Sequence, residues 1–210
     1  MLDVHPPHHA ASTWRDFFIH IITIVIGLLI AIGLEQTVEY IHNRRQIAEA
    51  RETIRQEITD NDVKIAHDVV ILKQAETRLQ SNLSTLQRNK TKPSTSDKLD
   101  SHWEWEGMQD SAWLTAQATG TLALMKYAEV QTYASAYKQQ TIVEQNADTY
   151  LKLHNRGFAP YMKTQDLSKL TTGDLDKLID GTSETLTQQQ FLYWLSVSLQ
   201  QSYAKALQLK

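Results

Sequence analysis

The stretch from Phe17 to Leu34 reads FFIHIITIVIGLLIAIGL and carries no formal charge. Its only polar side chains are those of His20 and Thr23. A helix of about 18 residues rises about 27 Å, close to the thickness of the hydrocarbon core of a bilayer. The stretch is apolar on every side, whereas the whole chain is polar, with a mean hydropathy of −0.41. We therefore predict a transmembrane helix over residues 17–34, with the lipid bilayer as its partner.

A cleaved signal peptide fits this stretch less well than a membrane span does. Residues 1–16 contain no basic region, and no Ala-x-Ala cleavage site precedes Glu35. Trp14 and Tyr40 flank the stretch, where aromatic side chains suit the headgroup region of a membrane.

The side of the membrane is indicated by the arginines that flank the predicted span. Arg15 precedes it, and four arginines follow it: Arg44, Arg45, Arg51 and Arg55. The positive-inside rule therefore favours a cytoplasmic position for the C-terminal region. The richness of the later chain in Gln, Thr, Ser and Tyr, without cysteine, keeps the periplasm open as an alternative.

Gly27 and Ala31 are four residues apart, a spacing that allows two helix backbones to approach closely in lipid. The alternative is that glycine and alanine are simply common in membrane helices. We expect a homo-oligomer, paired either through this membrane helix contact or through a water-side surface further along the chain.

Residues 35–90 show helical periodicity and predict a long helix that continues the span into water. Apolar side chains recur every seven residues: Ile58, Ile65, Leu72, Leu79 and Leu86. The companion positions of a parallel coiled coil are mostly unsuitable: Ile54, Asn61, Asp68, Ala75 and Asn82. The pattern therefore favours a helix that packs on other helices, with a kink or a restart at residues 60–62, where poor helix formers adjoin.

The remainder of the chain predicts a loop over residues 91–101 and a helical bundle over residues 102–210, completed by the long helix. Gly120 is expected to stop a short helix, Gly157 and Pro160 to end a long one, and Gly181 to break the chain again. No alternating strand pattern is found. The fold class is all-α: one N-terminal transmembrane helix running into a long helix, packed in a soluble bundle of four to five helices.

The sequence HPPHHAASTWRDFFIHIITIVIGLLIAIGLEQ at residues 5–36, followed by SAWLTAQATG at residues 111–120, resembles a group of uncharacterised bacterial single-pass membrane proteins. More distantly it is similar to a domain of unknown function with an apolar span and a helical tail. The resemblance implies a bacterial inner (plasma) membrane location and a helical structure. It brings no activity, cofactor or catalytic residue.

The motifs of known enzyme classes are missing from the sequence, which contains no cysteine and no GxSxG, HExxH, GxGxxG or GxxxxGK[ST]. Ser135 and Lys138, like Ser202 and Lys205, match the spacing SxxK without the partner motifs of serine acyltransferases. The formal net charge of −3 gives no reason to expect nucleic acid as a partner. We expect a protein that is not an enzyme and holds no cofactor.

Two residue clusters remain as candidate sites. His5, His8 and His9 in residues 1–16 would suit Zn, Ni or Cu and titrate near neutral pH, or they simply face water. Three tryptophans would anchor a partner, lie on a membrane surface, or close the end of the bundle: Trp103, Trp105 and Trp113.

The sequence therefore leaves two classes of function. The first is a membrane-anchored interaction protein, such as a scaffold, an assembly factor or an accessory subunit that binds an unidentified membrane protein. The second is a membrane sensor or signalling element that responds to pH or metal through the histidine-rich tail.

Overall fold

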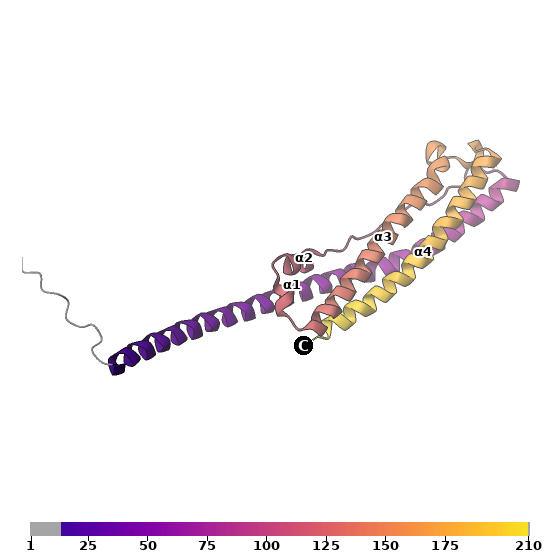
Figure 1. The fold of residues 1–210 in the computed structure, drawn as a ribbon. Helices are drawn as coiled ribbons and strands as arrows, with labels where there is room; N and C mark the ends of the chain where they lie inside the picture. The colour runs from indigo at the N-terminus through magenta and orange to yellow at the C-terminus, as the bar shows by residue number, and fades with distance from the viewer. Residues whose placement is uncertain (1–13, 210) are drawn as a thin grey trace, which may run out of the picture. The chain divides into compact units, whose positions relative to one another are not determined.

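The computed structural model describes residues 14–209, and these residues contain helices and no strand. This confirms the predicted all-α class. The helices are α1 (Trp14–Thr91), α2 (Ser111–Ala118), α3 (Tyr127–Thr164) and α4 (Thr172–Leu207), with short 3₁₀ helices at Thr121–Leu124 and Leu167–Lys169 (Figure 1).

The chain divides into two compact units, residues 1–48 and residues 49–210, and α1 contributes to both. In the first unit, α1 is long and apolar enough near the N-terminus to cross a membrane, and none of its most apolar stretch is buried. Large apolar side chains such as Ile24 and Leu29 are 67% and 62% exposed, so packing within the chain uses neither of them.

In the second unit, α1 and α3 run in the same direction along the bundle. Arg51 donates to both carboxylate oxygens of Glu129 at 2.5 and 2.6 Å. Further along both helices, the Asn61 amide donates to Oε1 of Gln140 at 3.3 Å. The later residue of α1 is bonded to the later residue of α3, so the two helices are parallel.

Helix α4 runs in the opposite direction and completes the bundle (Figure 1). Lys90, near the end of α1, pairs with Asp176 near the start of α4 at 2.5 Å. Gln190, further along α4, donates to Glu76 at 3.1 Å. The second unit therefore contains three long helices side by side and the eight-residue helix α2.

The apolar side chains of α1 that recur every seven residues, which we call the ladder, lie in the core of this bundle. This is what a helix that packs on other helices requires. The five members of the ladder are no more than 3% exposed: Ile58, Ile65, Leu72, Leu79 and Leu86. Leu192 and Leu199 of α4 are fully buried, whereas Leu195 is only half-buried.

The helix restart, one of the two expectations for residues 60–62, is not found, because α1 runs through these residues without interruption. Asn61 is 1% exposed, and its side-chain amide is used in contacts with another segment rather than with its own backbone. Tertiary hydrogen bonds therefore outweigh the poor helix propensity of these residues.

The breaks expected at Gly157, Pro160 and Gly181 are also wrong. α3 continues to Thr164 with Pro160 inside it, and α4 runs unbroken through Gly181. A Cβ added at Gly181 would lie 2.5 Å from Cα of Gly157, so the two glycines are the point where α3 and α4 touch through their backbones. Their missing side chains serve helix packing rather than helix termination.

Two local signals mark helix ends, and the helix stop predicted at Gly120 is confirmed. Thr171 and Asp174 form a capping box at the start of α4. Gly120 follows α2 in the left-handed region, at a φ of 72°, which explains the need for glycine there.

Candidate functional site

An extended segment, residues 92–110, lies along α1 and joins it to α2; we call this segment the strap. The predicted loop over residues 91–101 is thus only its first half. Strap and helix keep a regular register. Seven residues of helix rise about 10.5 Å, and three residues of extended chain cover about 10 Å. Every seventh residue of α1 can therefore meet every third residue of the strap.

Two asparagines of α1 bind the strap backbone in the same way. The N–H of Gln109 donates to Oδ1 of Asn61 at 2.9 Å, and Nδ2 of Asn61 donates back to the Gln109 carbonyl at 2.6 Å. Asn82 forms the same pair with Asp100, at 3.0 and 2.7 Å. An amide side chain carries both a donor and an acceptor, so it can satisfy both backbone groups of one residue.

The positions between and beyond these asparagines follow the same register. Asp68 accepts from the N–H of Glu106 at 3.0 Å, and Nδ2 of Asn89 donates to Asp97 at 2.8 Å. The register sets Ala75 level with Trp103. Three companion positions that suited a coiled coil poorly, Asn61, Asp68 and Asn82, therefore hold the strap.

Glu57 of α1 supplies the cap that α2 lacks. Asp110 stands at the N-cap of α2 without a side-chain cap hydrogen bond. Oε2 of Glu57 accepts from the N–H of Ala112 and from the hydroxyl of Ser111, both at 2.8 Å. A carboxylate at a helix N-terminus satisfies free N–H groups and is favoured by the helix dipole.

The tryptophans expected at a partner site or at the bundle end lie along the bundle beside α3, where they are half-buried. Trp103 stacks on Trp105, with ring centroids 6.5 Å apart, and meets Tyr150 edge-on at 5.6 Å. Trp113 stacks on Tyr137 at 5.3 Å. The strap and α2 thus use these rings to pack onto α3.

Asp68 is the most perturbed carboxyl of this region. It is fully buried, and its Oδ2 has no hydrogen-bond partner among the described residues. Burial raises the pKa of Asp68 from 3.8 to about 6. The nearby carboxylates of Glu106 and Glu144 add to this rise in pKa, and His67 opposes it.

We expect this carboxyl to make the stability of the bundle depend on pH. The folded state disfavours the charged form, so the contribution of Asp68 to stability is greatest below about pH 4 and is lost as the pH rises through about 6. A difference of about 2 in pKa corresponds to about 3 kcal/mol. Urea unfolding of the chain and of Asp68→Asn should diverge by about this amount between pH 4 and pH 7.5.

The exposed change Asp60→Asn on the same helix serves as the control for this measurement. It removes one carboxyl without touching the strap. A constant difference in unfolding free energy between the chain and Asp68→Asn across this pH range would contradict the prediction.

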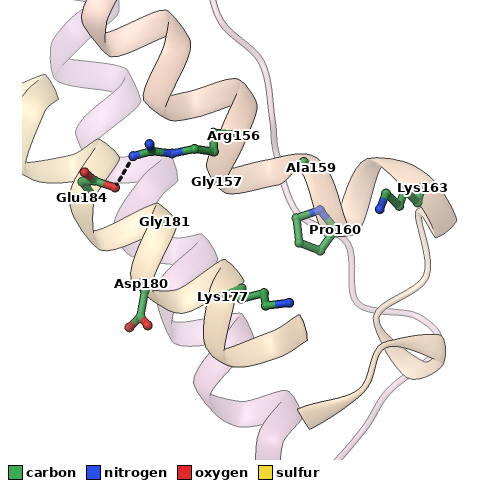
Figure 2. A pocket seen from close by; sticks show the side chains of 9 residues that line it. All are labelled: Arg156, Gly157, Ala159, Pro160, Lys163, Lys177, Asp180, Gly181 and Glu184. Atoms are coloured by element: carbon green, nitrogen blue, oxygen red, sulfur yellow. Dashed lines mark hydrogen bonds and ion pairs between the residues drawn. The ribbon is translucent and has the colours of Figure 1, made fainter. Parts of the chain in front are cut away.

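A pocket of about 440 Å³ lies beside the contact between Gly157 and Gly181 (Figure 2). Five charged side chains of both signs line it: Arg156, Lys163, Lys177, Asp180 and Glu184. Arg156 donates to Glu184 at 3.0 Å, so part of this charge is already paired. Because the lining carries both positive and negative side chains, it favours neither an anionic nor a cationic ligand.

A further surface, which the sequence did not single out, lies on the outer side of α3 and α4. Trp194 is 69% exposed, Phe191 52% and Ile142 39%. Two hydrogen bonds between the helices flank Ile142: Gln139 to Ser198 at 2.6 Å and Gln188 to Asn146 at 3.0 Å. They set Ile142 level with the two aromatic residues, and we call these three residues the aromatic face.

His5, His8 and His9 lie outside the described residues. Within residues 14–209, no group of three His, Cys, Asp or Glu side chains could hold a metal ion. Gly27 and Ala31 are exposed on α1, and a Cβ added at Gly27 would meet nothing within 4 Å.

Comparison of the chain with protein-family models, with curated proteins and with solved structures finds no match.

Proposed function

We propose that this protein is a membrane-anchored interaction protein, acting as a scaffold, an assembly factor or an accessory subunit rather than as an enzyme. The aromatic face is the observation that carries the proposal. Protein interfaces are enriched in aromatic residues and depleted in charge at their centres, and tryptophan is the residue most often found at their energetic hot spots. Trp194 and Phe191 fit this description.

The polar interior of the bundle supports a structural rather than a catalytic use of its buried groups. Glu57, Asn61 and Asn82 are each engaged with backbone groups of the strap or of α2. A general acid or base needs access to a substrate. These side chains are instead committed to holding an extended segment in place.

The apolar part of α1 would supply the anchor. A fully exposed helix of this composition is stable in lipid, where its backbone groups are satisfied internally and its side chains meet hydrocarbon. We propose that the chain spans a bacterial plasma membrane once, as its resemblance to single-pass membrane proteins implies. The arginines after the span favour a cytoplasmic bundle.

The proposal is tested by chemical cross-linking in cells, followed by extraction in mild detergent and mass spectrometry of the complexes. The chain should be recovered in an assembly with itself or with another protein. Trp194→Ala and Phe191→Ala should each reduce that assembly at least about tenfold, because truncating a hot-spot residue costs about 2 kcal/mol or more and about 1.4 kcal/mol is tenfold.

Tyr127→Ala is the matched control, since Tyr127 is an exposed aromatic residue, 77% exposed, at the start of α3. It should leave the assembly unchanged. Recovery of the chain only as a monomer would contradict the proposal. An assembly whose amount is unchanged by Trp194→Ala but changes with pH or added zinc would favour the alternative function as a sensor.

A further inference from the structure

The water-side surface expected to pair two copies of the chain is not free. The seven-residue ladder of α1 is buried in the bundle, with Ile58 and Ile65 at 0% exposure. Pairing through this ladder would require the bundle to open. Any water-side contact between folded copies must therefore use another surface.

The aromatic face lies in a region of α4 that carries no charge. No Asp, Glu, Lys or Arg occurs between Glu184 and Lys205. The bonds that flank Ile142 join amide and hydroxyl groups, which are also uncharged.

The two charged side chains that line a pocket with Trp194 belong to α1 and pair with each other. Trp194 shares a small pocket of about 300 Å³ with Lys73 and Glu76. Nζ of Lys73 donates to Glu76 at 2.7 Å, and it also lies 5.7 Å from the centre of the Tyr193 ring. The two charges that share this pocket with Trp194 therefore neutralise each other, and the nearest charge along α3 is the exposed Lys138, one turn before Ile142.

We propose that the aromatic face is the docking surface for a second copy of this chain. In a two-fold dimer the same surface meets itself, so any charge close to the axis meets an identical charge. A charge-free aromatic surface avoids this repulsion and gains from burying its rings.

Other surfaces of the bundle suit a two-fold contact less well. The pocket beside Gly157 and Gly181 is lined by five charged side chains. The strap exposes Glu104 and Glu106 close to His102 and His67. The inference also rests on the proposed anchoring, because two copies held in one membrane meet at a raised effective concentration.

The test uses the purified full chain in dodecyl maltoside, with its mass followed by analytical ultracentrifugation over a range of concentrations. We expect a reversible dimer. Trp194→Ala should raise its dissociation constant at least about 30-fold, the effect of losing a hot-spot aromatic residue. Trp194→Arg should abolish the dimer, since it places two like charges at the contact.

Several controls separate this surface from others. Tyr127→Ala should leave the dissociation constant unchanged. Gly27→Ile reports separately on any contact within the membrane helix. Thermal unfolding of each variant should match that of the parent chain, because Trp194 is largely exposed.

Single cysteines then locate the contact, since the chain has none of its own. Thr187→Cys and Gln201→Cys lie seven residues on either side of Trp194. Oxidation should link two copies of the same variant if the two α4 helices run parallel, and one copy of each variant if they run antiparallel. Gln80→Cys, exposed on α1, should not form a link.

The two proposals can fail separately. A monomer at all concentrations, or a dimer insensitive to both Trp194 substitutions, would overturn the second-copy inference. If the pure chain is monomeric but a different protein cross-links to it in cells in a Trp194-dependent manner, the interaction function stands and only the identity of the partner is wrong.

Discussion

Replacing Val25 and Leu29 together with arginine is expected to keep the chain out of the membrane. Both residues lie near the middle of the apolar stretch and are exposed along α1. An arginine at the centre of a membrane helix costs about 2.5–3.5 kcal/mol on insertion scales, so two cost about 5–7 kcal/mol. Alkaline carbonate extraction of membranes should recover the parent chain in the pellet and the double variant in the soluble or aggregated fraction.

The matched control places the same two substitutions on the bundle, as Val63→Arg with Val70→Arg. These valines are 69% and 54% exposed on α1, and neither belongs to the apolar stretch. This control should remain in the pellet. Release of the parent chain by carbonate would show that residues 17–34 do not span a membrane.

Leu192→Ala combined with Leu199→Ala is expected to unfold most of the bundle. Both leucines are at 0% exposure in the core between the long helices. Each Leu→Ala change in a core costs about 2–5 kcal/mol, and a domain of this kind has only about 5–15 kcal/mol of stability in total. Circular dichroism in detergent should show the cooperative thermal transition of the parent chain lowered or lost.

Leu114→Ala with Leu124→Ala removes the same atoms from exposed positions, at 51% and 42% exposure. This pair should shift the transition only slightly, because surface changes typically alter stability by about 0.5 kcal/mol or less. An unchanged transition in the core variant would mean that α4 does not contribute to a shared core.

Local signals allowed several elements to be predicted from the sequence. The apolar stretch, the buried ladder of α1 and the helix stop at Gly120 each depend on residues within a few turns of one another. The helix breaks predicted at Gly157, Pro160 and Gly181 failed because they also relied on local propensity. Phe158 and Tyr161, which are 1% and 5% exposed, show that packing outweighs the cost of proline in this part of α3.

The aromatic face was not predicted from the sequence, and it lies outside the apolar stripe that Leu192 and Leu199 form on α4. Trp194 and Phe191 lie off that stripe, which is the signal that could have revealed them. Large aromatic residues on the polar side of an amphipathic helix, in a region with no charge, are not explained by the core. Their exposure could be established only once the partners of α4 were known.

The sequence by itself determined the helical class, the apolar stretch and the buried ladder, because periodicity and composition act over short distances along the chain. Only the tertiary structure decided the role of the polar residues beside that ladder. Asn61 and Asn82 look unfavourable on α1 until the strap, whose residues follow 18 to 48 positions later, brings its backbone against them. Their donors and acceptors find partners only through the fold, and no local pattern in the sequence records that pairing.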